Sequence, residues 1–423
     1  MIANSLREGL NLYHMETAQF KTFHFSLYFH RQLQKEEVSL NALLPYVLKQ
    51  GSRHYPSGSA VYQELESLYG GTFDVTVRKK GDDQVLGFHF EFVSPTYIPN
   101  DSGYLDRVLS FVFDPFFHPL KEGEGFSTTI VEREKKNLDD YIHGVINDKK
   151  EYADLRCKEE MFQGEPFSLF EYGLLSTLEE ITPKALYQHF KKVLSQSKID
   201  AFLIGDVSKD AFVTPLSRLP QGEHPSAYPS IQLKELPKKV REVKEKMPVA
   251  QGKLSMGFVT GIAATDPQSL ALTVANSVFG SGAHSKLFNH VREKLSLCYY
   301  AYSRVDKFKG ILTVSSGVEF KNFKAAHDEI LLQLQQVKNG NITKEELTAA
   351  KGSLINTLLS MKDNPAIAED YYLNGAVGGK SLSVSEYIQG IEAVTVMDAA
   401  KAAQKITLDT VYYLTGEEEN NAV

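Results

Sequence analysis

The sequence has little cysteine, no tryptophan and no long apolar run. Its 423 residues include two cysteines, Cys157 and Cys298, too few for a disulfide framework or a cysteine-based zinc cluster. No stretch of about 18 apolar residues occurs, and the opening MIANSLREGLNLY does not combine a basic segment with an apolar core. We therefore expect a cytoplasmic protein without an export signal or a membrane-spanning segment.

Basic residues are not in excess either. The 46 lysines and arginines are outnumbered by 53 aspartates and glutamates, which gives a net charge of -7. Because nucleic-acid-binding domains usually carry a basic surface, this balance argues against nucleic acid as a partner. The length exceeds the roughly 250 to 300 residues that one hydrophobic core supports, so more than one domain is expected.

The most informative pattern in the chain is an internal duplication. Each half starts with a strand-like segment, at 20–29 or 253–262, followed by two helical segments and a pair of alternating strands. An offset of 229 residues places Ala42 opposite Ala271 in the first of these helices. The order of elements is therefore the same in both halves.

The later part of each half repeats as well. It contains an amphipathic helix, a long charged helix and a last helix that follows an N-cap-like threonine, Thr182 or Thr395. A proline-rich stretch with alternating charges separates the halves. We predict two α+β domains, 1–220 and 248–423, joined by a linker at 221–247. Each domain is expected to be an antiparallel or mixed sheet with helices packed on one face.

Common metal-binding spacings are missing. None of the 12 histidines forms an HxxxH, HExxH or HxxEH pattern. His24 and His30 lie six residues apart in a strand, about 20 Å at 3.3 Å per residue. His284 and His290 fall on different faces of a helix. Since zinc ligands must converge on one ion, we interpret the histidines as structural or surface residues.

The stretch FGSGAHSKLFNHVREKLSLCYYAY (279–302) offers two other interpretations. Gly280, Ser281 and Gly282 precede a helix, where free N–H groups attract anions, but the GxxxxGK[ST] and GxGxxG spacings are missing. A turn between two helices explains these glycines as well. No GxSxG motif occurs, and Cys298 in an alternating strand is expected to be buried and inert. Spacing alone gives a duplicated α+β protein without an evident active site.

The duplication and the string LFNHVREKLSLCYYAYS (287–303) together resemble the pitrilysin/insulinase family of inverted-zincin metallopeptidases. The similarity runs through nearly the whole chain and includes ALLPYVLKQGS and LESLYGG in the first half. It fits the two-domain branch that contains the mitochondrial processing peptidases. Members of this branch have two homologous α+β domains and act as a clam-shell of two chains.

In active members, an HxxEH helix supplies two zinc-binding histidines and a glutamate that activates water, and a glutamate on a later helix completes the site. The resemblance places Ala42 and Tyr46 at the histidine positions, Pro45 at the base position and Tyr141 at the position of the third ligand, with a family-like Glu134 nearby. Alanine and proline offer no lone pair to a metal, and a neutral tyrosine is a poor ligand. The resemblance thus implies an inactive zinc site and no cofactor bound by this chain.

The second half keeps another family motif, R-E-x-x-x-L-x-Y, as REKLSLCY (292–299). By resemblance, Arg292 and Tyr299 hold the substrate backbone and stabilise the oxyanion above the zinc ion. Both side chains are donors that can be aimed where negative charge develops. The loop Gly280–Gly282 also falls where the non-catalytic processing-peptidase subunit has a longer glycine-rich substrate loop, which suggests a role in substrate selection.

The resemblance therefore implies the non-zinc subunit of a heterodimeric peptidase. A homologous partner bearing HxxEH would supply zinc and the general base, while this chain binds an extended peptide and acts on it in trans. An alternative is a peptide-binding or scaffold pseudoenzyme that forms a homodimer without proteolysis, as some respiratory-complex subunits resemble the family. An active peptidase with unrecognised zinc ligands is a third hypothesis.

Overall fold

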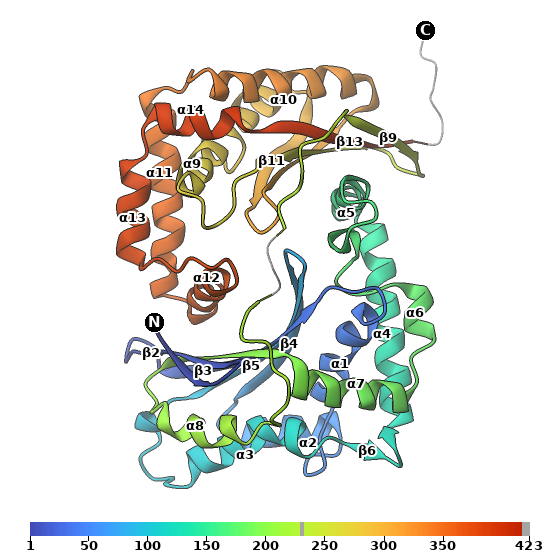
Figure 1. The fold of residues 1–423 in the computed structure, drawn as a ribbon, viewed down its shortest axis with the longest axis vertical. Helices are drawn as coiled ribbons and strands as arrows, with labels where there is room; N and C mark the ends of the chain where they lie inside the picture. The colour runs from blue at the N-terminus through green and yellow to red at the C-terminus, as the bar shows by residue number, and fades with distance from the viewer. Residues whose placement is uncertain (229–231, 417–423) are drawn as a thin grey trace. The chain divides into compact units, whose positions relative to one another are not determined.

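The computed structural model describes the chain except for residues 229–231 and 417–423. The chain folds into two compact units, and the colours of Figure 1 follow the chain from its N-terminus to its C-terminus. Unit 1 comprises Met1–His143 and Leu169–Ser230, and unit 2 comprises Gly144–Ser168 and Ile231–Val423. Among the described residues, none of the helices has the length and apolar character needed to span a lipid bilayer.

Unit 1 contains a six-stranded mixed sheet in the order β1-β2-β8-β3-β5-β4. Its strands are β1 (Ile2–Arg7), β2 (Leu10–Glu16), β3 (Thr22–Gln32), β4 (Thr72–Lys80), β5 (Asp83–Val93) and β8 (Lys198–Gly205). Strand β2 is parallel to β8, and the other pairs are antiparallel. In β3, Phe25 and Leu27 belong to the core beneath the helices, so Ser26 and His30 occupy the second face of the sheet.

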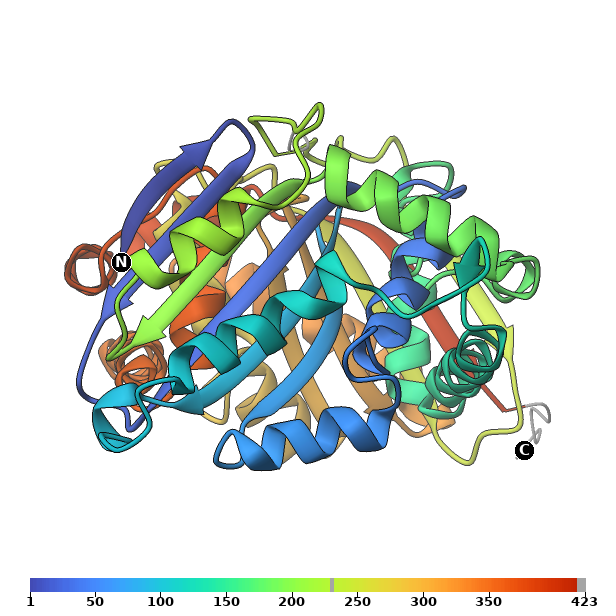
Figure 2. The same ribbon diagram turned by 90° about the horizontal axis from the view of Figure 1, so that it is seen from below.

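The helices of unit 1 lie on one face of this sheet and appear in front of it in Figure 2. They are α1 (Val38–Lys49), α2 (Gly58–Ser67), α3 (Tyr104–Phe117), α4 (Thr128–Asn147), α6 (Leu175–Glu179), α7 (Pro183–Gln196), α8 (Asp210–Ser217) and the 3-10 turn η1 (Pro95–Tyr97). A short hairpin, β6 (Lys121–Glu122) and β7 (Gly125–Phe126), joins α3 to α4. Helix α7 begins as predicted, because the Thr182 hydroxyl accepts the N–H of Ala185.

Unit 2 repeats this sheet as β11-β12-β10-β13-β9. Its strands are β9 (Arg241–Lys246), β10 (Gly252–Val259), β11 (Cys298–Asp306), β12 (Ile311–Val318) and β13 (Thr407–Thr415). Strand β9 is parallel to β13, as β2 is to β8 in unit 1. The two sheets therefore match strand for strand, and only β1 has no counterpart in the described part of unit 2.

The main helical layer of unit 2 covers the face of β10 that carries Leu254, Met256 and Phe258. Its members are α9 (Ser269–Phe279), the π-helix η3 (Leu287–Lys294), α10 (Phe323–Lys338), α11 (Lys344–Leu359), α12 (Pro365–Val377), α13 (Val384–Ala393), α14 (Val396–Gln404) and the 3-10 turns η4 (Phe320–Asn322) and η5 (Ser360–Lys362). Two homologous α+β domains with this layering confirm the predicted fold class.

The second face of the unit 2 sheet is covered by α5 (Lys149–Met161), which is followed by the 3-10 turn η2 (Pro166–Ser168). Ala153 and Cys157 of α5 pack against Tyr412 and Leu414, while the alternate residues of β13 enter the main core. Glu245 of β9 accepts hydrogen bonds from α5 as well. Helix α5 therefore belongs to unit 2, although it precedes most of that unit in the chain.

Two predicted boundaries differ from this arrangement. The predicted first domain, 1–220, includes α5, because a helix that follows another helix carries no sequence signal for the sheet on which it packs. The predicted linker, 221–247, contains β9 and the buried His224, whose Nδ1 lies 2.7 Å from the Ser197 carbonyl oxygen. Alternating charges suggested a solvated linker, whereas β9 is the edge strand that begins the second copy of the fold.

Candidate functional site

The positions compared with the zinc motif lie on α1 and α4 of unit 1. Ala42 is fully buried in the core, and Pro45 lies inside α1, where its ring nitrogen has no N–H. Tyr46 is half-buried on the same helix, and Tyr141 is exposed on α4. None of these four side chains combines the lone pair and the basicity of a histidine.

Tyr46 and Tyr141 come together with a third tyrosine, Tyr172. The ring centres of Tyr141 and Tyr172 are 4.5 Å apart, and those of Phe170 and Tyr172 are 5.3 Å apart. Burial and the neighbouring Tyr141 hydroxyl raise the pKa of Tyr46, and burial raises the pKa of Tyr172 well above its usual value. The phenols of Tyr46 and Tyr172 are thus neutral near pH 7. Sequence reasoning missed Tyr172 because no motif spacing connects it to the other two.

Glu134 on α4 is buried, and both of its carboxylate oxygens are engaged. One accepts a hydrogen bond from Arg133 Nε at 2.9 Å, and the other accepts one from Asn137 Nδ2 at 3.0 Å. Arg133 also donates to Gln50 at the end of α1 at 2.7 Å. Glu134 therefore helps to fix α4 against α1.

Arg292 of unit 2 is a half-exposed residue on the π-helix η3. Leu287 and Val291 are fully buried and anchor this helix to the core. The Arg292 guanidinium carbon lies 4.7 Å from the centre of the Phe288 ring, and Nε lies 3.5 Å from a carboxylate oxygen of Glu293. The guanidinium is thus oriented by its own helix while 43% of the side chain stays accessible to solvent.

Tyr299 occupies a β-bulge in the edge strand β11. Cys298 pairs with Val318 and Tyr300 pairs with Gly317, which leaves Tyr299 as the extra residue of the bulge. Its side chain is 64% exposed. A bulge changes the direction of the side chain of its extra residue, so the Tyr299 phenol does not follow the regular alternation of the strand.

A tight turn connects Arg292 to Tyr299. Ser296 adopts a left-handed conformation with φ +49°, and its N–H donates to the Arg292 carbonyl at 3.0 Å. The N–H of Leu297 donates to the Val291 carbonyl at the same distance. The turn therefore fixes the backbone of Arg292 to the segment that leads directly into Tyr299.

The loop Gly280–Gly282 forms the turn that follows α9. Gly280 is buried, its carbonyl accepts the N–H of Ser303 at 2.8 Å, and a Cβ added to it would lie 2.4 Å from the Ser303 hydroxyl. Gly282 has φ +116°, which favours glycine. Close packing on β11 therefore explains Gly280, while Ser281 and Gly282 reach the surface.

A buried charged cluster occupies the second face of the unit 1 sheet. His30 Nδ1 lies 2.6 Å from a carboxylate oxygen of Asp83, and Nε2 lies 3.0 Å from one of Asp200. Tyr228 and Asn11 also donate to Asp200, at 2.6 and 2.9 Å. Burial opposes a charge on His30, but the two carboxylates outweigh it and raise the pKa of His30 to about 9. No pattern in the sequence indicates this cluster, because it joins strands that are far apart in the chain.

One group of side chains in the described part of unit 1 has the composition of a metal site. His54, Asp114 and His118 each offer a ligand atom, and these atoms all lie within 4.8 Å of one another. Both histidines were interpreted as structural or surface residues, because none of the common metal-binding spacings occurs in the sequence. The i, i+4 pair Asp114 and His118 was the available signal.

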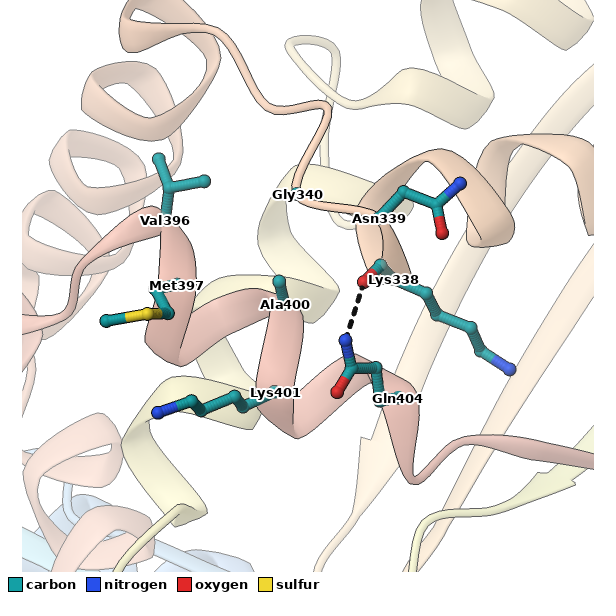
Figure 3. Close-up of a pocket in the computed structure, with 8 residues that line it drawn as sticks. All are labelled: Lys338, Asn339, Gly340, Val396, Met397, Ala400, Lys401 and Gln404. Atoms are coloured by element: carbon teal, nitrogen blue, oxygen red, sulfur yellow. Dashed lines mark hydrogen bonds between the residues drawn. The ribbon is translucent and has the colours of Figure 1, made fainter.

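Unit 2 has a surface hollow of about 690 Å³ between the end of α10 and the helix α14. Neither Arg292 nor Tyr299 lines it. Figure 3 shows its lining residues, namely Lys338, Asn339, Gly340, Val396, Met397, Ala400, Lys401 and Gln404. A hydrogen bond of 3.1 Å from Gln404 to the Lys338 carbonyl crosses it. Its lining combines the apolar side chains of Val396, Met397 and Ala400 with two lysines, Lys338 and Lys401.

Comparison with known proteins identifies the family. A family model described as the peptidase M16 inactive domain matches residues 180–354. YmfF of Bacillus subtilis strain 168, described as a probable inactive metalloprotease, is 33% identical over 97% of this chain and 96% of its own length. The chain belongs to the M16 metallopeptidase family. This assignment confirms the resemblance to the pitrilysin/insulinase peptidases.

A further relative and solved structures also match most of the chain. The uncharacterized zinc protease YmxG of the same Bacillus strain is 23% identical over 82% of this chain and 85% of its own length. A conserved protein from Enterococcus faecalis V583 has a TM-score of 0.92 at 30% identity, with 99% of each chain covered. The fold of an M16 inactive domain from Pseudomonas fluorescens agrees with a TM-score of 0.79 at 17% identity, over 99% of this chain and 98% of that one.

Proposed function

We propose that this M16 protein is the zinc-less subunit of a two-chain peptidase. It binds an extended peptide and supplies Arg292 and Tyr299 to an HxxEH-bearing partner, which holds the zinc ion and the general base. The observation that carries this proposal is the contrast between the two motifs. The zinc positions carry alanine, proline and two tyrosines in place of histidines and carboxylates, whereas Arg292 and Tyr299 are both accessible and joined by one tight turn.

The chemistry of the two side chains supports this role. A guanidinium and a phenol can both donate hydrogen bonds to a peptide carbonyl that becomes an oxyanion. Such donors work when they are fixed before the reaction, and Arg292 is held over Phe288 while Tyr299 is set by a bulge. Neither group can activate water in the way that a zinc-bound site does.

A homologous partner is supported by the relatives of the chain. The Bacillus strain that contains the probable inactive metalloprotease YmfF also contains YmxG, a second relative of this chain, which is named as an uncharacterized zinc protease. Two such proteins in one organism are what a divided peptidase requires.

The direct test is reconstitution with an HxxEH-bearing M16 homologue from the same organism. We expect cleavage of unfolded peptides by the mixture and not by this chain alone. Arg292→Ala should lower kcat by roughly 10²- to 10³-fold, the usual cost of removing one oxyanion donor. The matched control is Arg304→Ala, which removes an exposed arginine from β11, the strand that also carries Tyr299. This variant should leave the rate unchanged. Full activity of the Arg292→Ala, Tyr299→Phe double variant would contradict the proposed role.

The alternative, a peptide-binding or scaffold pseudoenzyme that forms a homodimer, has one observation in its favour. The charge of Arg292 already has two partners, the Phe288 ring and the Glu293 carboxylate. This hypothesis predicts a stable homodimer by light scattering and no gain of proteolysis with any HxxEH homologue. Peptide binding that persists in the double variant would favour it over the trans-acting subunit.

A further inference from the structure

The end of α1 and the end of α3 are held together in unit 1 by a short set of backbone contacts. Ser52 forms an isolated antiparallel bridge with Pro119. The N–H of Arg53 donates to the carbonyl of His118 at 2.8 Å. These contacts bring His54, in the loop after α1, next to the last turn of α3.

Two imidazoles meet one carboxylate at this junction. Nδ1 of His54 lies 2.6 Å from Oδ1 of Asp114, and Nδ1 of His118 lies 2.8 Å from that same oxygen. The two imidazole rings are 5.0 Å apart and nearly perpendicular. Both nitrogens therefore point at one oxygen atom from different directions.

The carboxylate of Asp114 is fixed from its other side. Its Oδ2 accepts a short hydrogen bond from the Ser52 hydroxyl and a longer one, 3.4 Å, from the N–H of His54. The carboxylate is thus held in a fixed orientation by Ser52 and the backbone, as metal-binding carboxylates are by their hydrogen-bonded neighbours.

We propose that His54, Asp114 and His118 form a binding site for one divalent transition-metal ion of the zinc class. Two imidazole nitrogens and one carboxylate oxygen are the donor set that zinc, cobalt and nickel accept, whereas magnesium and calcium prefer oxygen ligands alone. Water completes the coordination. A tetrahedral ion bound at 2.0 to 2.2 Å needs ligand atoms about 3.3 Å apart, so the nitrogens must each move by roughly 0.5 to 0.7 Å.

That movement is available to the two histidines. Their side chains are 59% and 43% exposed, while the Asp114 side chain is 6% exposed. A rotation of each imidazole ring lengthens the distance from its Nδ1 to Oδ1 of Asp114 and leaves the fixed carboxylate in place. In the bound state Nδ1 presents its lone pair to the ion, and the imidazole proton resides on Nε2.

This site is separate from the degenerate zinc motif of the family. It uses the loop after α1 and the end of α3, and it contains none of the residues at positions 42, 45, 46 or 141. The metal ion would connect that loop to α3 through His54 and add to the contacts already made by Ser52 and Arg53. Its expected effect is therefore on the stability of unit 1.

The test is cobalt and zinc binding by the full chain after removal of metal with a chelator. We expect one equivalent of Co²⁺ to give visible d–d absorption with nitrogen and oxygen ligation, and Zn²⁺ to displace it. The His54→Gln and His118→Gln variants should each weaken Zn²⁺ binding at least tenfold in calorimetry. His143→Gln is the matched control, because His143 also lies four residues after an aspartate, Asp139, but has no second histidine.

A second measurement separates binding from folding. Zinc should raise the thermal midpoint of the wild-type chain and of His143→Gln, but not that of the His54→Gln, His118→Gln double variant, while circular dichroism confirms that all three are folded. Equal Co²⁺ spectra for the double variant and the wild type would overturn the proposal. So would the absence of any binding above that of the double variant.

Discussion

Unit 1 and unit 2 share a strand order but use the second face of the sheet in opposite ways. An offset of 229 residues places Tyr28 and His30 of β3 opposite Gly257 and Val259 of β10. In unit 1 this face carries a large buried tyrosine and a charged histidine cluster. In unit 2 it is covered by α5, whose Met161 lies against Gly257.

The helical side of the two units differs as well. With Thr182 and Thr395 as equivalent N-caps, an offset of 213 residues relates α7 to α14. Unit 1 covers α7 with the β6–β7 hairpin, and Phe126 packs on Tyr187 and Phe190. Unit 2 connects α10 to α11 by a short loop, and the equivalent surface of α14 is the hollow in Figure 3. A duplicated fold thus kept its sheet while the surfaces on either side diverged.

The largest effect is expected from the charged cluster of unit 1. Asp200→Ala leaves His30 and Asp83 buried without their shared partner, and loss of one member of a buried pair costs about 3 to 5 kcal/mol. Thr410 of β13 pairs with Gly257 as Asp200 pairs with Tyr28, so Thr410→Val changes the equivalent position; it removes one buried hydrogen bond, to Asp409, and should cost only about 0.5 to 1.5 kcal/mol. Hydrogen exchange resolved by unit measures both, and equal losses would show that the two faces are energetically alike.

Much of this comparison could be predicted from the sequence, because helices and strands follow periodicity. The repeated order of elements, the N-caps at Thr182 and Thr395 and the paired strands came from patterns within about 20 residues. The position of α5, the role of β9 and the His30 cluster could not be predicted, since each depends on contacts between segments distant in the chain. A residue that is buried by a segment distant in the chain does not produce a periodic hydrophobic pattern in its own part of the sequence.

The candidate site likewise contains residues that could be predicted from the sequence and residues that could not. Arg292 and Tyr299 were found because a motif spans them, although the bulge that exposes Tyr299 was not visible. Tyr172 and the convergence of His54 with His118 lay outside any motif. Their proximity results from packing of α1 against other elements of unit 1.

The next effect concerns the hairpin that covers α7. Phe126→Ala removes a buried ring that contacts Tyr187 and Phe190, and we expect a loss of about 3 kcal/mol from unit 1. Met397→Ala on the uncovered helix of unit 2 changes a side chain that is 62% exposed and should stay within about 0.5 kcal/mol. Urea unfolding followed by a probe in each unit tests the difference. A comparable loss for Met397→Ala would mean that the hollow is filled in solution.

One buried histidine of unit 1 should make a pH-dependent contribution that has no counterpart at the equivalent position of unit 2. Burial lowers the pKa of His189 from 6.5 to about 4, so the folded state favours the neutral ring. The resulting stability is fully present above pH 6.5 and is lost as the pH falls toward 4, by roughly 3 kcal/mol in total. Residue Ala402 stands at the equivalent place in unit 2. Hydrogen exchange at pH 7, 5.5 and 4.5 measures the free energy of unfolding of unit 1. His189→Gln should reduce the loss of this free energy between pH 7 and pH 4.5. An unchanged loss would show that the His189 ring does not cause it.

The smallest effect tests whether α5 needs Gly257. A Cβ at this position would lie 2.7 Å from the Met161 sulfur, so Gly257→Ala forces the methionine or the helix to shift and should cost about 1 to 2 kcal/mol. Gly352→Ala in α11 is the contrasting change, because its Cβ meets nothing within 4 Å and alanine favours the helix by up to about 1 kcal/mol. Opposite signs in the thermal midpoint of unit 2 would show that α5 approaches the sheet closely in solution. If both changes stabilise the unit, α5 packs more loosely on β10 than these distances require.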